Sequence, residues 1–217
     1  MRPTRGLSCF ALAVLLAVGP LAPRATAADD AAAFMTSLGK RVISIINDTQ
    51  RPETVRRQAF RTVVDKAFDL PAIARWVLGG FWRTASRAEQ HQFVTAFHNY
   101  MVQAYWSRFS SHKGERFRVL GEKSQDNGSV LVTSELRRPG SGQAPVKVSW
   151  LLEPHGGTFK IWDASVEGVS QAETYRDEFA DIIERGGGRV SVLIKKLNGR
   201  SGARAIPAMT VAGRSQR

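Results

Sequence analysis

Residues 159–170 read FKIWDASVEGVS, and residues 171–179 continue as QAETYRDEF. The first run is rich in β-branched and aromatic residues, which favour a strand, and the strand pattern stops at Gly168. Ser170 and Glu173 have the S-x-x-E spacing of a capping box, in which each side chain accepts a hydrogen bond from a free N–H at a helix start. A strand therefore turns directly into a helix, and the two elements must pack around one shared interior.

Three further runs upstream alternate apolar and other residues with the period of two that strands have. Turn signals separate them at 126–128 (DNG), 138–142 (RPGSG) and 155–157 (HGG). Four consecutive strands with short turns predict an antiparallel meander, and its apolar face must be covered by helices. The apolar positions of the three upstream runs are Phe117, Val119, Val130, Val132, Val146, Val148, Trp150 and Leu152.

Helical spacing accounts for most of the remaining chain. Asp69 is placed to cap a short helix that ends at Gly79-Gly80, and Ser86 with Glu89 forms a second capping box. The predicted helices cover residues 31–47, 52–67, 70–78, 86–109, 170–185 and 190–197. The expected fold class is α+β, with a four-stranded antiparallel meander packed against several helices and an apolar pocket enclosed between them.

The two ends of the chain differ from its body. Arg2 and Arg5 precede an apolar run at 7–18, and Ala25-Thr26-Ala27 offers the small-x-small pattern that signal peptidase cuts. We therefore expect a signal peptide at 1–27, one domain at 28–199 and a basic disordered tail at 200–217. The one cysteine, Cys9, lies in the signal segment, so the mature protein would have no disulfide and no thiol nucleophile.

The net charge of +12 invites a nucleic-acid interpretation, but its distribution argues against one. Eight basic residues and no acidic residue lie between Arg185 and the end, whereas residues 28–184 contain 20 basic and 19 acidic residues. We therefore predict no nucleic-acid partner. The basic tail is either simply solvated or weakly attracted to anionic lipid headgroups.

Candidates for catalysis are few. His91 and His98 are seven residues apart on one predicted helix, so they cannot share a metal as an i, i+4 pair could. Asp163 and Glu167 can be interpreted as an acid/base couple, or Asp163 can fix the strand–helix turn through a backbone or arginine contact, which is the interpretation we favour. We predict no catalytic residue, no metal site and no cofactor.

Two blocks of the sequence together resemble one protein family. The first contains Asp163, Glu167 to Ser170, Arg176, Glu178, Phe179 and Gly186-Gly187. The second contains Phe68-Asp69, Ala74-Arg75, Leu78-Gly79, Trp82-Arg83, Phe93, Phe97 and Tyr105. Their order and separation resemble the MlaC or toluene-tolerance family of periplasmic lipid carriers, and the resemblance covers roughly residues 31–197.

The resemblance implies a function. Proteins of this type carry a phospholipid across the periplasm between an outer-membrane lipoprotein complex and an inner-membrane ABC transporter with a lipid-binding ring component. Their pocket lies between the sheet and the helices, takes the acyl chains and leaves the headgroup outside. A hopanoid-associated branch exists, so a hopanoid is the alternative cargo.

The expected lipid-binding residues are the apolar side chains of the helix 86–109, its neighbours and the inner sheet face. They are Trp76, Val77, Phe93, Phe97, Tyr100, Met101, Tyr105, Val132, Val148, Trp150, Leu152, Val166 and Val169. A packed core and a pocket lining are made of the same types of apolar side chain, so the sequence pattern does not distinguish the two. Two rival classes stay open: a periplasmic enzyme acting on an apolar substrate, which needs a polar pair in the cleft, and a ligand-free interaction module, which needs a solid core.

Overall fold

The structure is a computed structural model that describes residues 27–110, 114–140 and 142–200. The predicted signal peptide and basic tail lie outside these residues, except for Ala27 and Arg200. The helices are α1 (Ala27–Asn47), α2 (Glu53–Ala67), α3 (Leu70–Leu78), α4 (Phe81–Thr84), α5 (Arg87–Ser110), α6 (Gln171–Arg185) and α7 (Val190–Arg200). The strands are β1 (Arg116–Ser124), β2 (Val130–Arg137), β3 (Val146–His155), β4 (Thr158–Val166) and β5 (Val169–Ser170). None of the described helices is both long enough and apolar enough to cross a bilayer.

The strands form one antiparallel sheet in the order β1-β2-β3-β4-β5, so the predicted α+β meander is confirmed with one strand more than expected. The additional strand, β5, has two residues, too few to show alternation in the sequence. Glu167 and Gly168 connect it to β4 with φ angles of 49° and 84°, as in a type I′ turn. The Glu167 carboxylate also accepts a hydrogen bond from Lys147 N at 2.7 Å, which fixes the turn against β3.

Helix starts follow the predicted caps. At α5, Glu89 N donates to Ser86 Oγ at 3.2 Å and Ser86 N donates to the Glu89 carboxylate at 3.0 Å. At α3, Ala72 N donates to Asp69 Oδ1 at 3.2 Å. The short helix α4 was not predicted, because four residues are too few to show a helical period.

The junction between β4 and α6 depends on Asp163. The pairing of β3 with β4 shifts register there, so Leu152 faces Ile161 whereas Leu151 faces Asp163. Asp163 Oδ1 accepts a hydrogen bond from Ala172 N at 3.0 Å, and Ser170 Oγ accepts one from Glu173 N at 3.1 Å. Two side chains therefore cap the first turn of α6, and Asp163 fixes this junction through a backbone contact.

Replacing Asp163 should loosen this junction. We expect Asp163→Ala to lower the free energy of unfolding by about 1–2 kcal/mol, because a backbone N–H and the positive end of the α6 dipole lose their acceptor. Asp163→Asn should lose only about half as much free energy of unfolding, since its amide oxygen can still accept the hydrogen bond from Ala172 N. Urea unfolding followed by circular dichroism measures both. A fully stable Asp163→Ala protein that no longer binds ligand would instead assign Asp163 to function.

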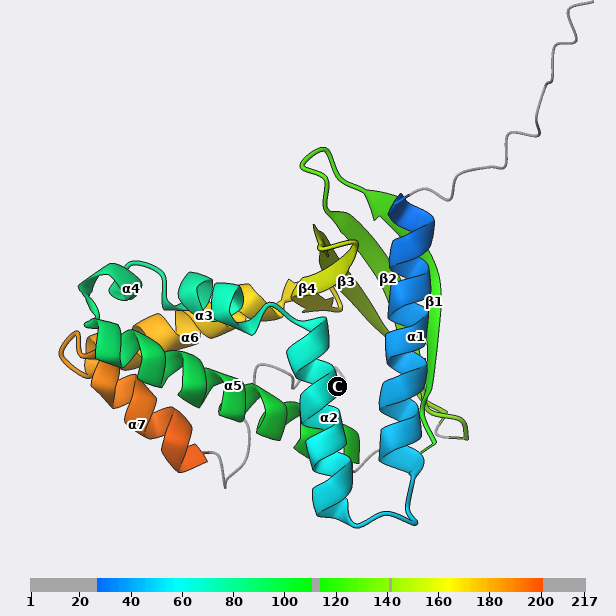
Figure 1. The fold of residues 1–217 in the computed structure, drawn as a ribbon, viewed down its shortest axis with the longest axis horizontal. Helices are drawn as coiled ribbons and strands as arrows, with labels where there is room; N and C mark the ends of the chain where they lie inside the picture. The colour runs from blue at the N-terminus through cyan, green and yellow to red at the C-terminus, as the bar shows by residue number, and fades with distance from the viewer. Residues whose placement is uncertain (1–26, 111–113, 141, 201–217) are drawn as a thin grey trace, which may run out of the picture.

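The interior is divided between two groups of elements. Figure 1 shows α1 lying along the sheet beside β1, the helices α3 to α7 gathered on the other side, and α2 between the two groups. In the helical core, rings of α5 and α6 pack edge to face: Phe93 and Phe97 each lie 6.0 Å from Phe179. In the sheet core, Met35 of α1 packs with inner strand residues, among them Val132 and Ile161. The two groups thus have separate cores.

Candidate ligand-binding cavity

A cavity of about 120 Å³ lies where α1, α2 and the last turns of α5 face the sheet. It has room for roughly ten molecules the size of water, since one water needs about 10–15 Å³ by this measure. Helix α2 contributes Phe60, Val63 and Val64, and β3 and β4 contribute Val146, Val148 and Val166. The walls are therefore almost entirely apolar, which suits hydrocarbon and not polar chemistry.

One wall is the inner face of α1, with Leu38, Val42 and Ile46. Gly39 lies at its centre, and a Cβ atom added there would lie 2.2 Å from the ring of Phe117 on β1. Glycine inside a helix costs about 1 kcal/mol relative to alanine, so its presence here has a steric reason. It lets the helix backbone approach β1 while the Phe117 ring lines the cavity.

Two successive buried hydrogen bonds fix Trp150 in the opposite wall of the cavity. The indole N–H donates to Ser134 Oγ at 2.8 Å, and the Ser134 hydroxyl donates to the Val148 carbonyl at 3.2 Å. Ser134 is fully buried, so these bonds satisfy a hydroxyl that would otherwise be costly. The ring of Trp150 is thereby fixed along the cavity wall with its polar atom turned into the sheet.

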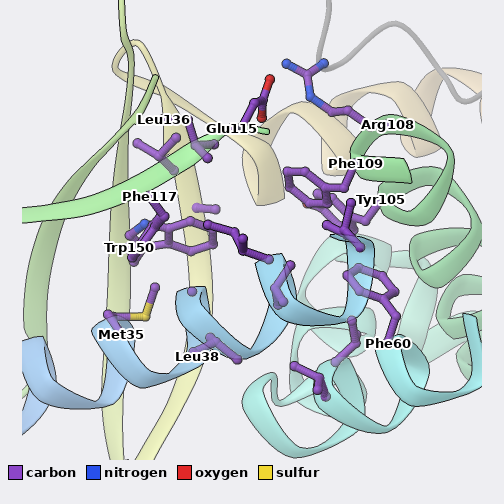
Figure 2. A pocket seen from close by; sticks show the side chains of 18 of the residues that line it. Met35, Leu38, Phe60, Tyr105, Arg108, Phe109, Glu115, Phe117, Leu136 and Trp150 are labelled. Atoms are coloured by element: carbon purple, nitrogen blue, oxygen red, sulfur yellow. The ribbon is translucent and has the colours of Figure 1, made fainter. Parts of the chain in front are cut away.

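The charged groups among the described lining residues are Arg108, near the end of α5, and Glu115, just before β1. Figure 2 shows these two side chains at one end of the cavity, above Phe109 and Tyr105. Arg138, which follows β2, donates to Glu115 Oε1 at 3.0 Å. Burial raises the pKa of the Glu115 carboxyl, and the nearby Arg108 guanidinium opposes that rise. The charged groups thus lie together at one end of a largely apolar cavity.

Tyr105 connects the cavity to the helical core. This residue lines the cavity and is 9% exposed. Burial, and then the negative charge of Asp163, raises the pKa of its phenol far above the usual value. Tyr105 is therefore a neutral wall residue and not a candidate base.

The comparisons with known proteins agree with this architecture. The family model described as MlaC protein matches residues 36–199, which include every lining residue of the cavity except Met35. The chain belongs to the MlaC family. The sequence resemblance to this family is confirmed.

Two individual proteins are similar to this member of the MlaC family. The toluene tolerance protein ttg2D of Pseudomonas putida is 23% identical over 130 residues, a match that spans 59% of this chain and 60% of the relative. A crystal structure of the phospholipid-binding protein from Ralstonia solanacearum, in complex with a phospholipid, superposes with a TM-score of 0.68. That match is 23% identical and covers 79% of this chain and 97% of the other, and it shows the fold.

Four of the thirteen residues expected to bind lipid lie along the cavity: Tyr105, Val148, Trp150 and Val166. The others lie elsewhere for identifiable reasons. Val77, Phe93, Phe97, Tyr100 and Met101 pack in the helical core, because α6 and α7 cover that face of α5. Val132 and Leu152 pack in the sheet core beneath α1.

Trp76 and Val169 lie at the surface. Trp76 is partly buried and packs edge-on against Trp162 at 5.2 Å, and the Arg176 guanidinium lies 4.8 Å from its ring centroid. Val169 is 48% exposed on β5. Neither is among the residues that line the cavity of this MlaC-family chain.

The α1 and α2 walls were not predicted from the sequence. Leu38, Val42, Phe60 and Val64 have the pattern of ordinary buried helix faces, and only the resulting fold shows that both faces meet an open space. One signal was present in the sequence. Gly39 interrupts an otherwise apolar amphipathic helix, which indicates close approach by another segment.

The histidine that the sequence singled out on α5 has a structural partner. His98 Nε2 bonds to Asp65 Oδ1, and Arg61 Nη2 contacts its Nδ1 at 3.2 Å, so His98 links α5 to α2. Within the described residues, no three His, Cys, Asp or Glu side chains are grouped as metal ligands.

Proposed function

We propose that this MlaC-family protein is a periplasmic phospholipid carrier that shelters acyl chains in the cavity between α1, α2, α5 and the sheet. The observation that carries the proposal is the arrangement of that cavity, which is apolar along its walls and charged at one end. The similar protein from Ralstonia solanacearum is in complex with a phospholipid, which supports the same ligand class.

The energetics explain why such a carrier is needed. A diacyl lipid exposes about 30 methylene groups, and each costs about 0.8 kcal/mol in water, so a free lipid is disfavoured by roughly 20 kcal/mol. Burial of the acyl chains against the apolar walls of the cavity removes much of this cost. Because the protein makes few polar contacts to the lipid, the lipid can still be released.

The cavity as it stands, at about 120 Å³, is smaller than the roughly 300–1,000 Å³ of a typical ligand pocket. We therefore infer that the walls separate when a lipid enters. The α1 and α2 walls are joined to the sheet by side-chain packing, and a polar link, from Ala32 N to the Glu122 carboxylate, lies at the far end of α1. Separation of α1 and α2 from β3 and β4 would widen the cavity without breaking the sheet.

The remaining parts of the proposal come from the family resemblance. The protein carries the lipid between an outer-membrane lipoprotein complex and an inner-membrane ABC transporter with a lipid-binding ring component, in either direction. A hopanoid is the alternative cargo. The signal-like sequence at 1–27 supports export to the periplasm.

A vesicle assay tests the carrier function. Donor vesicles contain a fluorescent phospholipid and a quencher, and acceptor vesicles contain neither. The protein should speed dequenching in proportion to its concentration and retain labelled lipid after the vesicles are removed. Absence of both effects would reject the carrier proposal.

A further inference from the structure

We propose that the outer face of the sheet docks on a membrane surface that contains anionic phospholipids. The docking surface is the end of this face where β1, β2 and β3 present four basic side chains, those of Arg116, Arg118, Arg137 and Lys147. The inference goes beyond the carrier function, because it concerns how the protein meets a bilayer and not what its cavity holds.

The strand alternation places these four side chains on one face. The cavity is lined by Phe117 on β1, Leu136 on β2 and Val148 on β3, so these residues point to the inner face of the sheet. Successive side chains of a strand point to opposite faces, so the chain neighbours of these residues point outward. Those neighbours include all four basic residues of the docking surface.

The pairing of the strands gathers positive charge that the fold does not neutralise. Arg116 lies directly opposite Arg137, an arrangement of like charges that destabilises a sheet. The Glu135 carboxylate lies 3.1 Å from Arg118 and 3.9 Å from Arg137. The Arg116 guanidinium has no hydrogen bond or ion pair within the part of the chain that the structure describes. An anion outside the protein would relieve this repulsion.

The docking surface is open to solvent and includes an apolar side chain. The side chains of Arg118 and Arg137 are 70% and 56% exposed, and Arg116 and Lys147 are exposed as well. Leu120, at the irregularity in the pairing of β1 with β2, is 42% exposed. Basic side chains beside an exposed apolar one suit an anionic bilayer, which offers headgroup phosphates and, beneath them, hydrocarbon.

The charge balance favours a broad anionic surface over a single small anion. Two carboxylates accompany the four basic residues: Glu135, and Glu167, which accepts a hydrogen bond from Lys147 N. The surface therefore has an excess of positive charge spread across three strands. Each basic residue near an anionic membrane strengthens binding by about fivefold, so this surface binds weakly and reversibly. A protein that leaves the membrane again requires such binding.

The docking surface and the charged end of the cavity lie at the same end of the sheet. The lining residues Glu115, Leu136 and Val146 each come one position before a basic residue of the docking surface. A protein docked through this surface therefore has that end of its cavity close to the membrane.

Vesicle sedimentation tests the docking surface. The protein, purified from the periplasm without detergent, is mixed with sucrose-loaded vesicles of phosphatidylcholine, either alone or with about one third phosphatidylglycerol. The protein should pellet with the anionic vesicles and stay in solution with the neutral ones. Raising the salt concentration from about 0.05 M to about 0.5 M should release it, because salt screens exposed charges. Equal pelleting with both kinds of vesicle, or no pelleting with anionic vesicles at low salt, would overturn the inference.

Charge variants test whether this face makes the contact. Arg116→Gln should weaken binding to the anionic vesicles by about fivefold, and its combination with Arg137→Gln should weaken binding by more than about tenfold. Glu135→Gln should strengthen binding by about fivefold, because it removes a negative charge from the same surface. Arg116→Gln also removes a like-charge pair, so circular dichroism should show no loss of stability. A double variant that pellets as the wild type does would contradict the inference.

Arg185→Gln is the matched control. Arg185 is 79% exposed and bonds to Asp181 at the end of α6, which lies on the opposite side of the molecule from β1 (Figure 1). This variant makes the same change in net charge and should alter binding by less than about twofold, because its charge lies beyond the range of unscreened interaction. Equal losses in Arg185→Gln and Arg116→Gln would assign membrane binding to net charge alone and overturn the inference.

The vesicle transfer assay separates this inference from the carrier function. Lipid transfer by a protein that does not pellet with anionic vesicles would reject the docking surface alone. Salt-sensitive pelleting by a protein that transfers no lipid would support the docking surface and reject the carrier function.

Discussion

Val148→Trp should abolish lipid uptake while leaving the protein folded. Val148 is 4% exposed on β3 and lines the cavity beside Ala164 and Val166. An indole ring there occupies space that acyl chains need. Exclusion of only two methylene groups costs about 1.6 kcal/mol, so uptake should fall by more than about tenfold. Overpacking should lower the free energy of unfolding by about 1–3 kcal/mol.

Val169→Trp is the control for Val148→Trp, since Val169 is 48% exposed and lies outside the cavity. Native mass spectrometry after incubation with vesicles measures lipid uptake, and circular dichroism reports folding. If Val148→Trp does not fold, Val146→Trp at the partly buried edge of the same wall replaces it. Undiminished uptake in a folded Val148→Trp protein would show that the acyl chains lie elsewhere.

Gly39→Ala should destabilise the protein, although alanine is the better helix former. The added Cβ would lie 2.2 Å from Phe117 Cδ1, so either the ring must move into the cavity or α1 must move away from β1. The gain in helix propensity is about 1 kcal/mol, and the overpacking cost is about 1–3 kcal/mol. We expect a net loss of up to about 2 kcal/mol in urea unfolding, together with reduced lipid uptake.

Two controls identify the cause of the Gly39→Ala effect. Gly199→Ala, in α7 with open space around it, should stabilise the protein by about 0.5–1 kcal/mol. In a Phe117→Ala background, Gly39→Ala should become neutral or stabilising, because the ring that it meets is gone. If Gly39→Ala raises stability as much as Gly199→Ala does, the close approach of α1 to β1 is not the reason for the glycine.

Local signals in the sequence were sufficient for the elements of this fold other than the short α4 and β5. Ser86 and Glu89 placed the start of α5, Asp69 placed the start of α3, and the glycines at 156–157 placed the turn between β3 and β4. Each of these acts through its own backbone within a few residues. The register shift opposite Leu151 and Leu152 has no such signal, because it is set by how β4 meets α6.

The site required information that local patterns do not contain. Phe93 and Phe60 are the same residue type and both are buried on helices, yet Phe93 packs against Phe179 and Phe60 lines the cavity. The difference lies in what covers each helix face. Helices α6 and α7 cover α5 over most of its length and leave Tyr105, Arg108 and Phe109 facing the open space. The sequence therefore indicates the MlaC family and the β3 wall, but not the α1 and α2 walls.

Native mass spectrometry of the protein, purified from the periplasm without detergent, tests the carrier function most directly. We predict the mass of the chain plus one lipid, and extraction should identify that lipid as a phospholipid. A hopanoid would retain the carrier function and identify the alternative cargo. The mass of the bare chain, with no gain after incubation with phospholipid vesicles, would contradict the carrier function.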